Sequence, residues 1–155
     1  SSTVLEGAGL VEAFLVLLLI VALGIVFDII GVAVMSAEEK PFHAMAAKKV
    51  PGAAEALHLL RNAEKVSSFC NDVVGDICGV VSGSAGAALT MRIGEKMGLS
   101  STFVVGILVA AFIAAFTVGG KAIGKTFAVN SCTQIVHMVG KVLHALNGLH
   151  GKKKK

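Results

Sequence analysis

The charged residues of this chain are distributed so that three long stretches are almost free of charge. These stretches are residues 13–37, in which Asp28 is the one charge, residues 73–91, in which Asp76 is the one charge, and residues 97–120, which have none. A helix needs about 20 mostly apolar residues to cross the roughly 30 Å of membrane hydrocarbon, where its backbone polar groups must bond internally. The sequence therefore predicts three transmembrane helices.

The composition argues against a water-soluble alternative. Of the 155 residues, 55% are hydrophobic and 15% are charged, and the mean hydropathy is +0.81. In a typical soluble domain about 25% of residues are charged, and a soluble domain of this length could not bury so much apolar surface. We therefore expect an all-α membrane protein, with one transmembrane domain over residues 1–149 and a basic tail over residues 150–155.

Local signals set the expected helix boundaries. Lys40-Pro41 ends the first span, since proline removes a backbone donor and disfavours helix in the residue before it. Pro51-Gly52 breaks an amphipathic stretch, and Gly119-Gly120 with Gly124 is expected to interrupt or kink the chain after the third span. The expected spans are about 11–37, 68–92 and 100–120, and the expected interfacial helices are about 42–66 and 130–149.

An apolar stripe at helical spacing marks the second interfacial helix. Its members are Ile135, Val139, Val142, Leu146 and Leu149. The stripe predicts that this helix lies at the cytoplasmic membrane surface. A helix that packs as an ordinary soluble element on the membrane domain fits the same pattern, and both interpretations stay open.

Lysine and arginine predict the orientation, because the cytoplasmic loops of membrane proteins carry an excess of both. Putting the 38–72 connection and the C-terminal region on one side places 12 of the 14 Lys and Arg residues there. The sequence thus predicts a plasma-membrane protein with its N-terminus outside and its C-terminus in the cytoplasm. The tail residues Lys152, Lys153, Lys154 and Lys155 are expected to bind anionic lipid headgroups, unless they are a remnant of expression.

Polar groups in the spans are the candidate functional residues. Four hard oxygen donors lie in or beside the first two spans: Asp28, Asn71, Asp72 and Asp76. A carboxylate in a membrane normally faces the bundle interior, pairs, or lines an ion path, and magnesium prefers oxygen ligands. One hypothesis is therefore a magnesium site. The other is that Asp72 is solvated, while Asp28 and Asp76 form ion pairs with Lys121 or Lys125.

Small residues at every fourth position form a second pattern, in the middle span. Gly75, Gly79 and Gly83 lie on one helix stripe, and such stripes let two helix backbones approach closely. We expect this stripe to face another helix, either of the same chain or of a partner.

Catalysis has little support in the sequence. The spans contain serines but no histidine to activate them, and neither GxSxG nor HExxH occurs. Asp28 and Asp76 could act as a pair of aspartates in intramembrane proteolysis, but no accompanying motif supports this. We expect a protein that is not an enzyme.

Two segments of the chain carry a family resemblance. Residues 46–71, AAKKVPGAAEALHLLRNAEKVSSFCN, follow the long first span, and residues 119–128, GGKAIGKTFA, lie at the exit of the third. Both segments resemble the membrane domain of CorB/CorC-type (cyclin M-like) magnesium transporters, whose third-span exit reads Phe-Gly-Glu-x-x-Pro-Lys-x-x-Ala. The layout of the chain over roughly residues 10–148 is also similar to that family.

The resemblance implies a homodimer in which each protomer binds a magnesium ion between its three helices. By position, Asn71 matches the family's second-helix asparagine, Gly120 the motif glycine that contributes backbone, and Lys125 the motif lysine. Lys121 stands where the family has glutamate, and Gly124 where it has proline. The cytoplasmic CBS pair that usually follows in the family is missing from this sequence.

The sequence therefore supports two function classes. One is a minimal CorB/CorC-like membrane domain that handles magnesium or another divalent cation. The other is a structural or assembly-forming membrane protein that keeps the fold without transport, its aspartates bridged by Lys121. The two classes differ in whether Asp28, Asp72 and Asp76 meet at a common cavity, and in whether Lys121 fills it.

Overall fold

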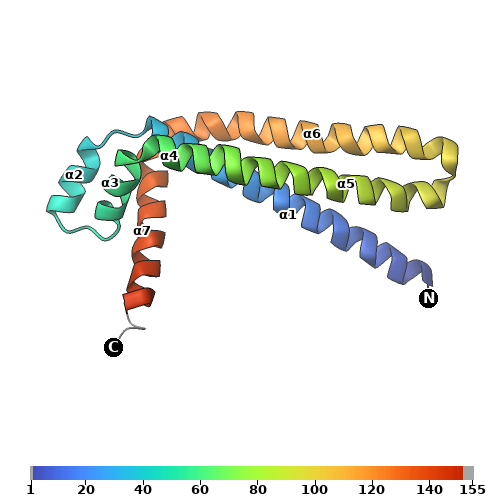
Figure 1. Ribbon diagram of the computed structural model, residues 1–155, viewed down its shortest axis with the longest axis horizontal. Helices are drawn as coiled ribbons and strands as arrows, with labels where there is room; N and C mark the ends of the chain where they lie inside the picture. Colours follow the sequence, from blue (N-terminus) through green and yellow to red (C-terminus); the bar gives the residue numbers. More distant parts are fainter. Residues whose placement is uncertain (1, 152–155) are drawn as a thin grey trace.

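The computed structural model describes residues 2–151, and the described residues form helices and short connections (Figure 1). The elements are α1 (Ser2–Ser36), α2 (Lys40–Ala47), α3 (Ala53–Arg61), α4 (Ala63–Ser68), the π-helical segment η1 (Phe69–Val74), α5 (Gly75–Met97), α6 (Leu99–Asn130) and α7 (Cys132–Gly151). The predicted all-α fold is confirmed.

Three helical segments are long and apolar enough to cross a membrane. They are Val11–Ser36 in α1, Ala63–Glu95 across α4, η1 and α5, and Phe103–Asn130 in α6. At about 1.5 Å of rise per residue, each is longer than the roughly 30 Å of membrane hydrocarbon. The prediction of three candidate spans is therefore confirmed.

The three long helices lie along one direction, and the short helices gather at one end of them (Figure 1). α1 packs against both α5 and α6, which also pack against each other. We call the end that carries α2, α3 and α7 the juxtamembrane end, and the end at the α5–α6 connection the hairpin end. Gly98 makes that connection with a positive φ of 90°, a conformation that glycine adopts without steric cost.

Two predicted boundaries are wrong. α6 continues without interruption through Gly119, Gly120 and Gly124 to Asn130, instead of ending near residue 120. These glycines do not end the helix because two of them serve packing. A Cβ on Gly120 would meet the side chain of Ile25, and one on Gly124 would lie 2.8 Å from the side chain of Ile29. The absence of side chains there lets α6 approach α1.

The second wrong boundary lies before the middle span. Pro51-Gly52 separates α2 from α3, as expected, but the residues from Ala63 onward already belong to the second long helix rather than to an interfacial one. The middle span therefore begins about five residues earlier than the sequence indicated, with a π-helical turn inside it.

The best-packed part of the molecule is the juxtamembrane end. Ala33 of α1, Phe42 of α2, Ala56 of α3, Ala128 of α6 and Val136 of α7 are fully buried there in one cluster. Five elements thus meet around a single core. This core fixes where α7 leaves the bundle.

α7 docks on α3 at a point where two backbones touch. Gly52, which precedes α3, has a φ of 85°, and a Cβ on it would lie 2.6 Å from the backbone nitrogen of Lys141. A Cβ on Gly140 would meet the carbonyl oxygen of Gly52. Both positions require glycine, because a side chain at either would push the two elements apart.

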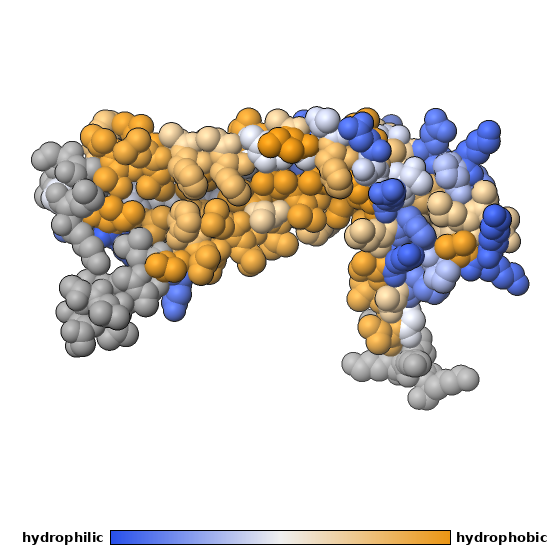
Figure 2. Space-filling model, turned by 180° about the vertical axis from the view of Figure 1, so that it is seen from behind, coloured by the Kyte–Doolittle hydropathy of each residue, from blue (hydrophilic) through white to orange (hydrophobic). Residues whose placement is uncertain are grey.

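The predicted apolar stripe of α7 is only partly the face that packs. Of its members, Ile135 and Val139 are half-buried, whereas Val142, Leu146 and Leu149 are exposed, Leu149 by 68%. The fully packed positions of α7 are Val136 and Gly140, which are not in the stripe. α7 therefore has two apolar sides, one against α3 and one uncovered. Figure 2 shows hydrophobic surface along the bundle and on the side of α7 turned toward it, and hydrophilic surface gathered at the juxtamembrane end.

Candidate functional site

An ion pair lies between the first and third long helices. Lys121 Nζ of α6 is 3.7 Å from Asp28 Oδ1 of α1. Asp28 is 6% exposed and the Lys121 side chain 33% exposed. An isolated carboxylate inside a membrane bundle costs several kcal/mol, and the ammonium beside it offsets part of that cost.

Asn71 is the second polar side chain of this interior. It comes from η1, and its Nδ2 donates to Ser67 Oγ at 3.2 Å. The side-chain oxygen Oδ1 of Asn71 lies beside Gly31, where a Cβ would be 2.7 Å from it. Gly31 follows Asp28 by three residues and so lies on the same face of α1. The glycine thus makes room for an amide close to the buried acid.

Two buried oxygen atoms in this region have no hydrogen-bond partner among the described residues. They are Asp28 Oδ2 and Asn71 Oδ1. Buried polar atoms normally have a partner, so two without one are unusual; one belongs to Asp28 and the other lies beside Gly31, one turn further along α1. We refer to Asp28, Asn71 and Lys121 together as the inner polar cluster.

A small cavity of about 90 Å³ borders the inner polar cluster. Its lining includes Lys121, Gly24, Gly75, Cys78 and Thr117. A Cβ on Gly75 would lie 3.8 Å from Lys121 Nζ, an ordinary contact distance, so the ammonium lies beside α5 as well as beside Asp28. A cavity of about 10–15 Å³ is enough to hold a water molecule. The ammonium of Lys121 therefore has space beside it for water.

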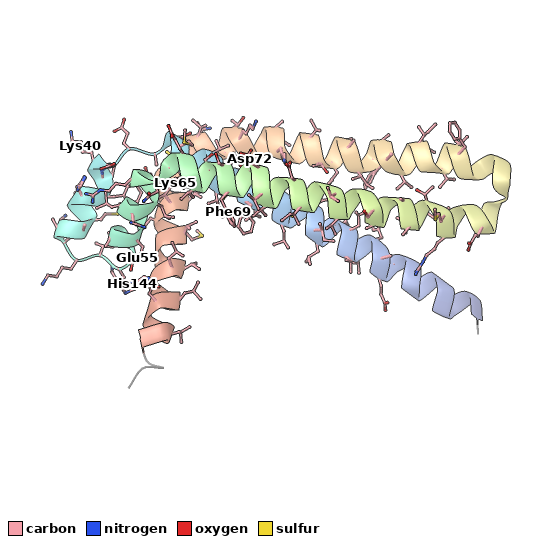
Figure 3. All side chains as sticks on the ribbon, in the orientation of Figure 1. Lys40, Glu55, Lys65, Phe69, Asp72 and His144 are labelled. Carbon is pink, nitrogen blue, oxygen red and sulfur yellow. The ribbon has the colours of Figure 1, made fainter. Side chains whose placement is uncertain are left out.

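The other predicted ligands lie on the outside of the bundle. Asp72 and Asp76 are exposed, and neither side chain has a hydrogen bond or ion pair with any described residue. Figure 3 marks Asp72 at the juxtamembrane end of the middle span. Lys125 of α6 is likewise exposed and unpaired within the described part of the chain.

The proposed magnesium ligands therefore separate into two groups. Asp28 and Asn71 face the interior, Asp72 and Asp76 face outward, and Gly120 packs on α1. Over the residues that the structure describes, no three His, Cys, Asp or Glu side chains converge as metal ligands would. Magnesium in proteins is usually held by one or two carboxylates and several waters. Here the buried carboxylate already has an ammonium 3.7 Å away, which repels a cation, so the donor set fits a divalent ion poorly.

A long groove runs between α5 and α6 on the outer side. Its volume is about 720 Å³. Small residues make up much of its lining: Gly79, Gly83 and Ala87 of α5, and Gly106, Ala110 and Ala114 of α6. A Cβ on Gly79 or Gly83 would meet nothing within 4 Å. We call this feature the α5/α6 groove.

Other glycines make the close helix contacts within the chain. A Cβ on Gly24 would lie 3.1 Å from Cys78 Cβ, one on Gly86 would lie 2.6 Å from Ile113, and one on Gly106 would lie 3.1 Å from Thr90. The predicted stripe of Gly75, Gly79 and Gly83 packs no helix of its own chain beyond Gly75. Its role toward a partner stays a prediction.

The sequence missed two contributors to the inner polar cluster. Ser67, which lies before the expected start of the middle span, accepts the hydrogen bond of Asn71. Gly31 admits the amide. A glycine three residues after an acid inside a span could have indicated Gly31. That spacing puts the glycine on the same helix face as the acid, where the missing side chain leaves space for another group.

A separate polar contact joins α3 and α7. Glu55 Oε1 and His144 Nδ1 are 2.8 Å apart (Figure 3). The hydrogen bond from His144 lowers the pKa of Glu55 from its ordinary value of 4.5. His137 Nε2 lies 3.3 Å from the carbonyl oxygen of Pro51. Both histidines thus hold α7 at the start of α3.

Comparison with protein-family models, curated proteins and solved structures finds no match to this chain. Function therefore has to be argued from the residues. The predicted lipid-binding tail, Lys152–Lys155, lies outside the described residues.

Proposed function

We propose that this chain is an assembly-forming membrane protein, not an enzyme, that neutralises its own buried acid instead of carrying a cation. The observation that supports this proposal is the position of Lys121 Nζ, 3.7 Å from Asp28 Oδ1 inside the bundle. A fixed ammonium at that distance repels a divalent cation and replaces the charge that such an ion would supply.

The dispersal of the other acids supports the same proposal. A magnesium site in this bundle would need a carboxylate that is not already paired, with further oxygen ligands or waters around one cavity. Asp72 and Asp76 instead face away from Asp28, where they are free to contact another molecule. The buried acid thus has a countercharge within the chain, whereas the two exposed acids have none among the described residues.

Thermal unfolding in magnesium tests the proposal. We expect the melting temperature of the purified protein to be unchanged by millimolar MgCl2, relative to NaCl at the same ionic strength. Asp28→Asn, which removes the buried charge, should behave in the same way. A magnesium-dependent rise in melting temperature that Asp28→Asn abolishes, and Asp76→Asn leaves intact, would contradict it.

Divalent-cation handling, as in the CorB/CorC-type family that the sequence resembles, is the second candidate. The two unpartnered oxygens, Asp28 Oδ2 and Asn71 Oδ1, favour it, because free buried oxygens are what a magnesium ion would bind. On this proposal, magnesium at about a hundred times its dissociation constant stabilises the fold by about 2.7 kcal/mol. Lys121 would then have to turn toward the neighbouring cavity.

For the orientation, we propose that the juxtamembrane end lies in the cytoplasm at the plasma membrane. The Lys and Arg distribution supports this orientation, and anionic headgroups are the expected contact of the basic C-terminal region. Cysteine labels at Thr3 and Gly98 should react from outside cells, and a label at Ala54 only after permeabilisation. Labelling at Ala54 in intact cells would contradict this orientation.

A further inference from the structure

The side of α7 that faces away from α3 is apolar and uncovered. Four large side chains there are between 54% and 68% exposed: Met138, Val142, Leu146 and Leu149. They follow one another at intervals of three or four residues, which keeps them on one helical face. Contiguous exposed apolar surface of this kind marks a contact with a membrane or with another protein. We call this face the uncovered side of α7.

The opposite side of α7 is held by α3. Gly140 meets the backbone of Gly52, and His144 Nδ1 lies 2.8 Å from Glu55 Oε1. Gly140 precedes Val142 by two residues and His144 follows it by two, which places both about 200° around the helix from Val142. The contacts with α3 therefore set the direction in which the uncovered side points.

That direction is toward the bundle of long helices. α7 runs crosswise to these helices (Figure 1), and its hydrophobic surface is on the side turned toward the bundle (Figure 2). The long helices contain the three segments that can cross a membrane, so their common direction is close to the membrane normal. A helix crosswise to them lies along the membrane surface, and the side that it turns toward the bundle faces the lipid around the bundle.

α7 also begins at the level of the lipid headgroups. The third span covers Phe103–Asn130, which is 28 residues, and α7 starts at Cys132. At about 1.5 Å of rise per residue the span extends about 42 Å, as far as the roughly 40–45 Å of a bilayer with both headgroup regions. A span of this length reaches from one headgroup region to the other, so the helix that follows it starts among the headgroups.

The charges beside the uncovered side complement an anionic lipid surface. Lys141 is exposed and lies about 100° around α7 from Val142, at the edge of the apolar face. Over the described residues, its side chain has neither an ion pair nor a hydrogen bond, and α7 itself carries no acidic residue. Basic side chains at the edge of an apolar helix face reach anionic headgroups while the face itself enters the bilayer.

We propose that α7 is a membrane-surface helix, with its uncovered side inserted between the lipid headgroups and Lys141 on an anionic headgroup. Its partner is therefore the lipid leaflet at the juxtamembrane end. A water-soluble protein would reach α7 from the water, whereas the uncovered side faces the bundle and the lipid beside it. The inference requires the three spans, but neither the assembly role nor the cytoplasmic orientation.

Tryptophan fluorescence of the full chain in lipid vesicles tests the inference, because the sequence contains no tryptophan of its own. Leu146→Trp puts the probe on the uncovered side. Gly148→Trp is the matched control, about 200° around the helix from Leu146, where a Cβ meets nothing within 4 Å. Lipid brominated near the top of its acyl chains should quench the fluorescence of Leu146→Trp, and aqueous iodide that of Gly148→Trp.

Two other outcomes would overturn the inference. Quenching of Leu146→Trp by iodide and not by brominated lipid would show that the uncovered side faces water. Protection of Leu146→Trp from both quenchers would show that protein covers this side, either a second copy of the chain or another partner.

The headgroup contact is tested in mixed vesicles in which either the phosphatidylglycerol or the phosphatidylcholine carries the bromine. Quenching of Leu146→Trp should favour brominated phosphatidylglycerol at least twofold. Adding Lys141→Gln should remove most of that preference, whereas Lys48→Gln, an equal loss of charge at an exposed position after α2, should retain it. A preference that is absent from Leu146→Trp, or that survives Lys141→Gln, would overturn the contact with an anionic headgroup.

Discussion

The inner polar cluster and the two outer acids, Asp72 and Asp76, place carboxylates of the spans in different surroundings. Asp28 is buried, and Lys121 from the same chain lies 3.7 Å from it. Asp72 and Asp76 have no such neighbour and face outward. The difference shows that the fold supplies a countercharge for one acid and none, among the described residues, for the other two.

The glycines divide in the same way. Gly120 and Gly124 are inner glycines, whose missing side chains admit Ile25 and Ile29 of α1, whereas Gly79 and Gly119 face open space. Some glycines of the spans therefore pack against a neighbouring helix of the chain, and others lie on its surface. Their spacing in the sequence does not show which glycines do which.

Comparing an inner and an outer glycine should give the largest effect. Gly120→Leu must displace Ile25, and overpacking of this kind costs typically 1–3 kcal/mol, so we expect a loss of about 3 kcal/mol in the free energy of unfolding. Gly119→Leu should change it by less than about 0.5 kcal/mol. Unfolding in mixed micelles measures both. Equal losses would show that α6 does not face α1 through Gly120.

The two sides of α7 should differ by a smaller amount. Gly140→Val inserts a side chain where α7 meets the backbone of Gly52, and we expect α7 to detach from α3 at a cost of about 2 kcal/mol. Leu146→Ser, on the exposed side, should leave that docking intact but weaken the attachment of α7 to membranes. Hydrogen exchange of the α7 amides reports docking. Protection of α7 that survives Gly140→Val would contradict the packing.

The smallest effect concerns acid pH and the contact between Glu55 and His144. Because the pKa of Glu55 is lowered in the folded state, its contact stabilises the docked helix above pH 4.5, the ordinary value for the group, and is lost as pH falls through the lowered pKa. Hydrogen exchange of α7 should therefore rise in that acid range. Glu55→Gln should remove this pH dependence, and an unchanged acid response in that variant would assign the effect to another group.

The sequence predicted the number and rough position of the three spans because long charge-free stretches depend only on the thickness of the membrane. It mispredicted the end of α6 because Gly119, Gly120 and Gly124 look the same whether they end a helix or pack it. That choice depends on Ile25 and Ile29, which lie about 95 residues away and reach the glycines only in the folded bundle.

The candidate site was predicted in part for a similar reason. The sequence singled out Asp28 inside the first span and Lys121 at the exit of the third, and an ion pair between them was one of its two hypotheses. What the sequence left open is which acid meets which lysine, because it does not show that Asp28 faces the interior while Asp72 and Asp76 face outward. The π-helical turn of η1, which carries Asn71 and Asp72, also shifts the helix phase in a way that a regular 3.6-residue period does not anticipate.

The central claim, that Lys121 supplies the countercharge of Asp28, is tested most directly by a double-mutant cycle on the free energy of unfolding. Asp28→Asn, Lys121→Met and their combination are measured in detergent, under conditions that keep the chain monomeric. Asp76→Asn with Lys125→Met serves as the matched outer cycle. We expect an inner coupling of about 2 kcal/mol and an outer coupling near zero, because groups in contact couple by 0.5–3 kcal/mol. An inner coupling near zero, with each single variant as stable as the parent chain, would contradict the claim.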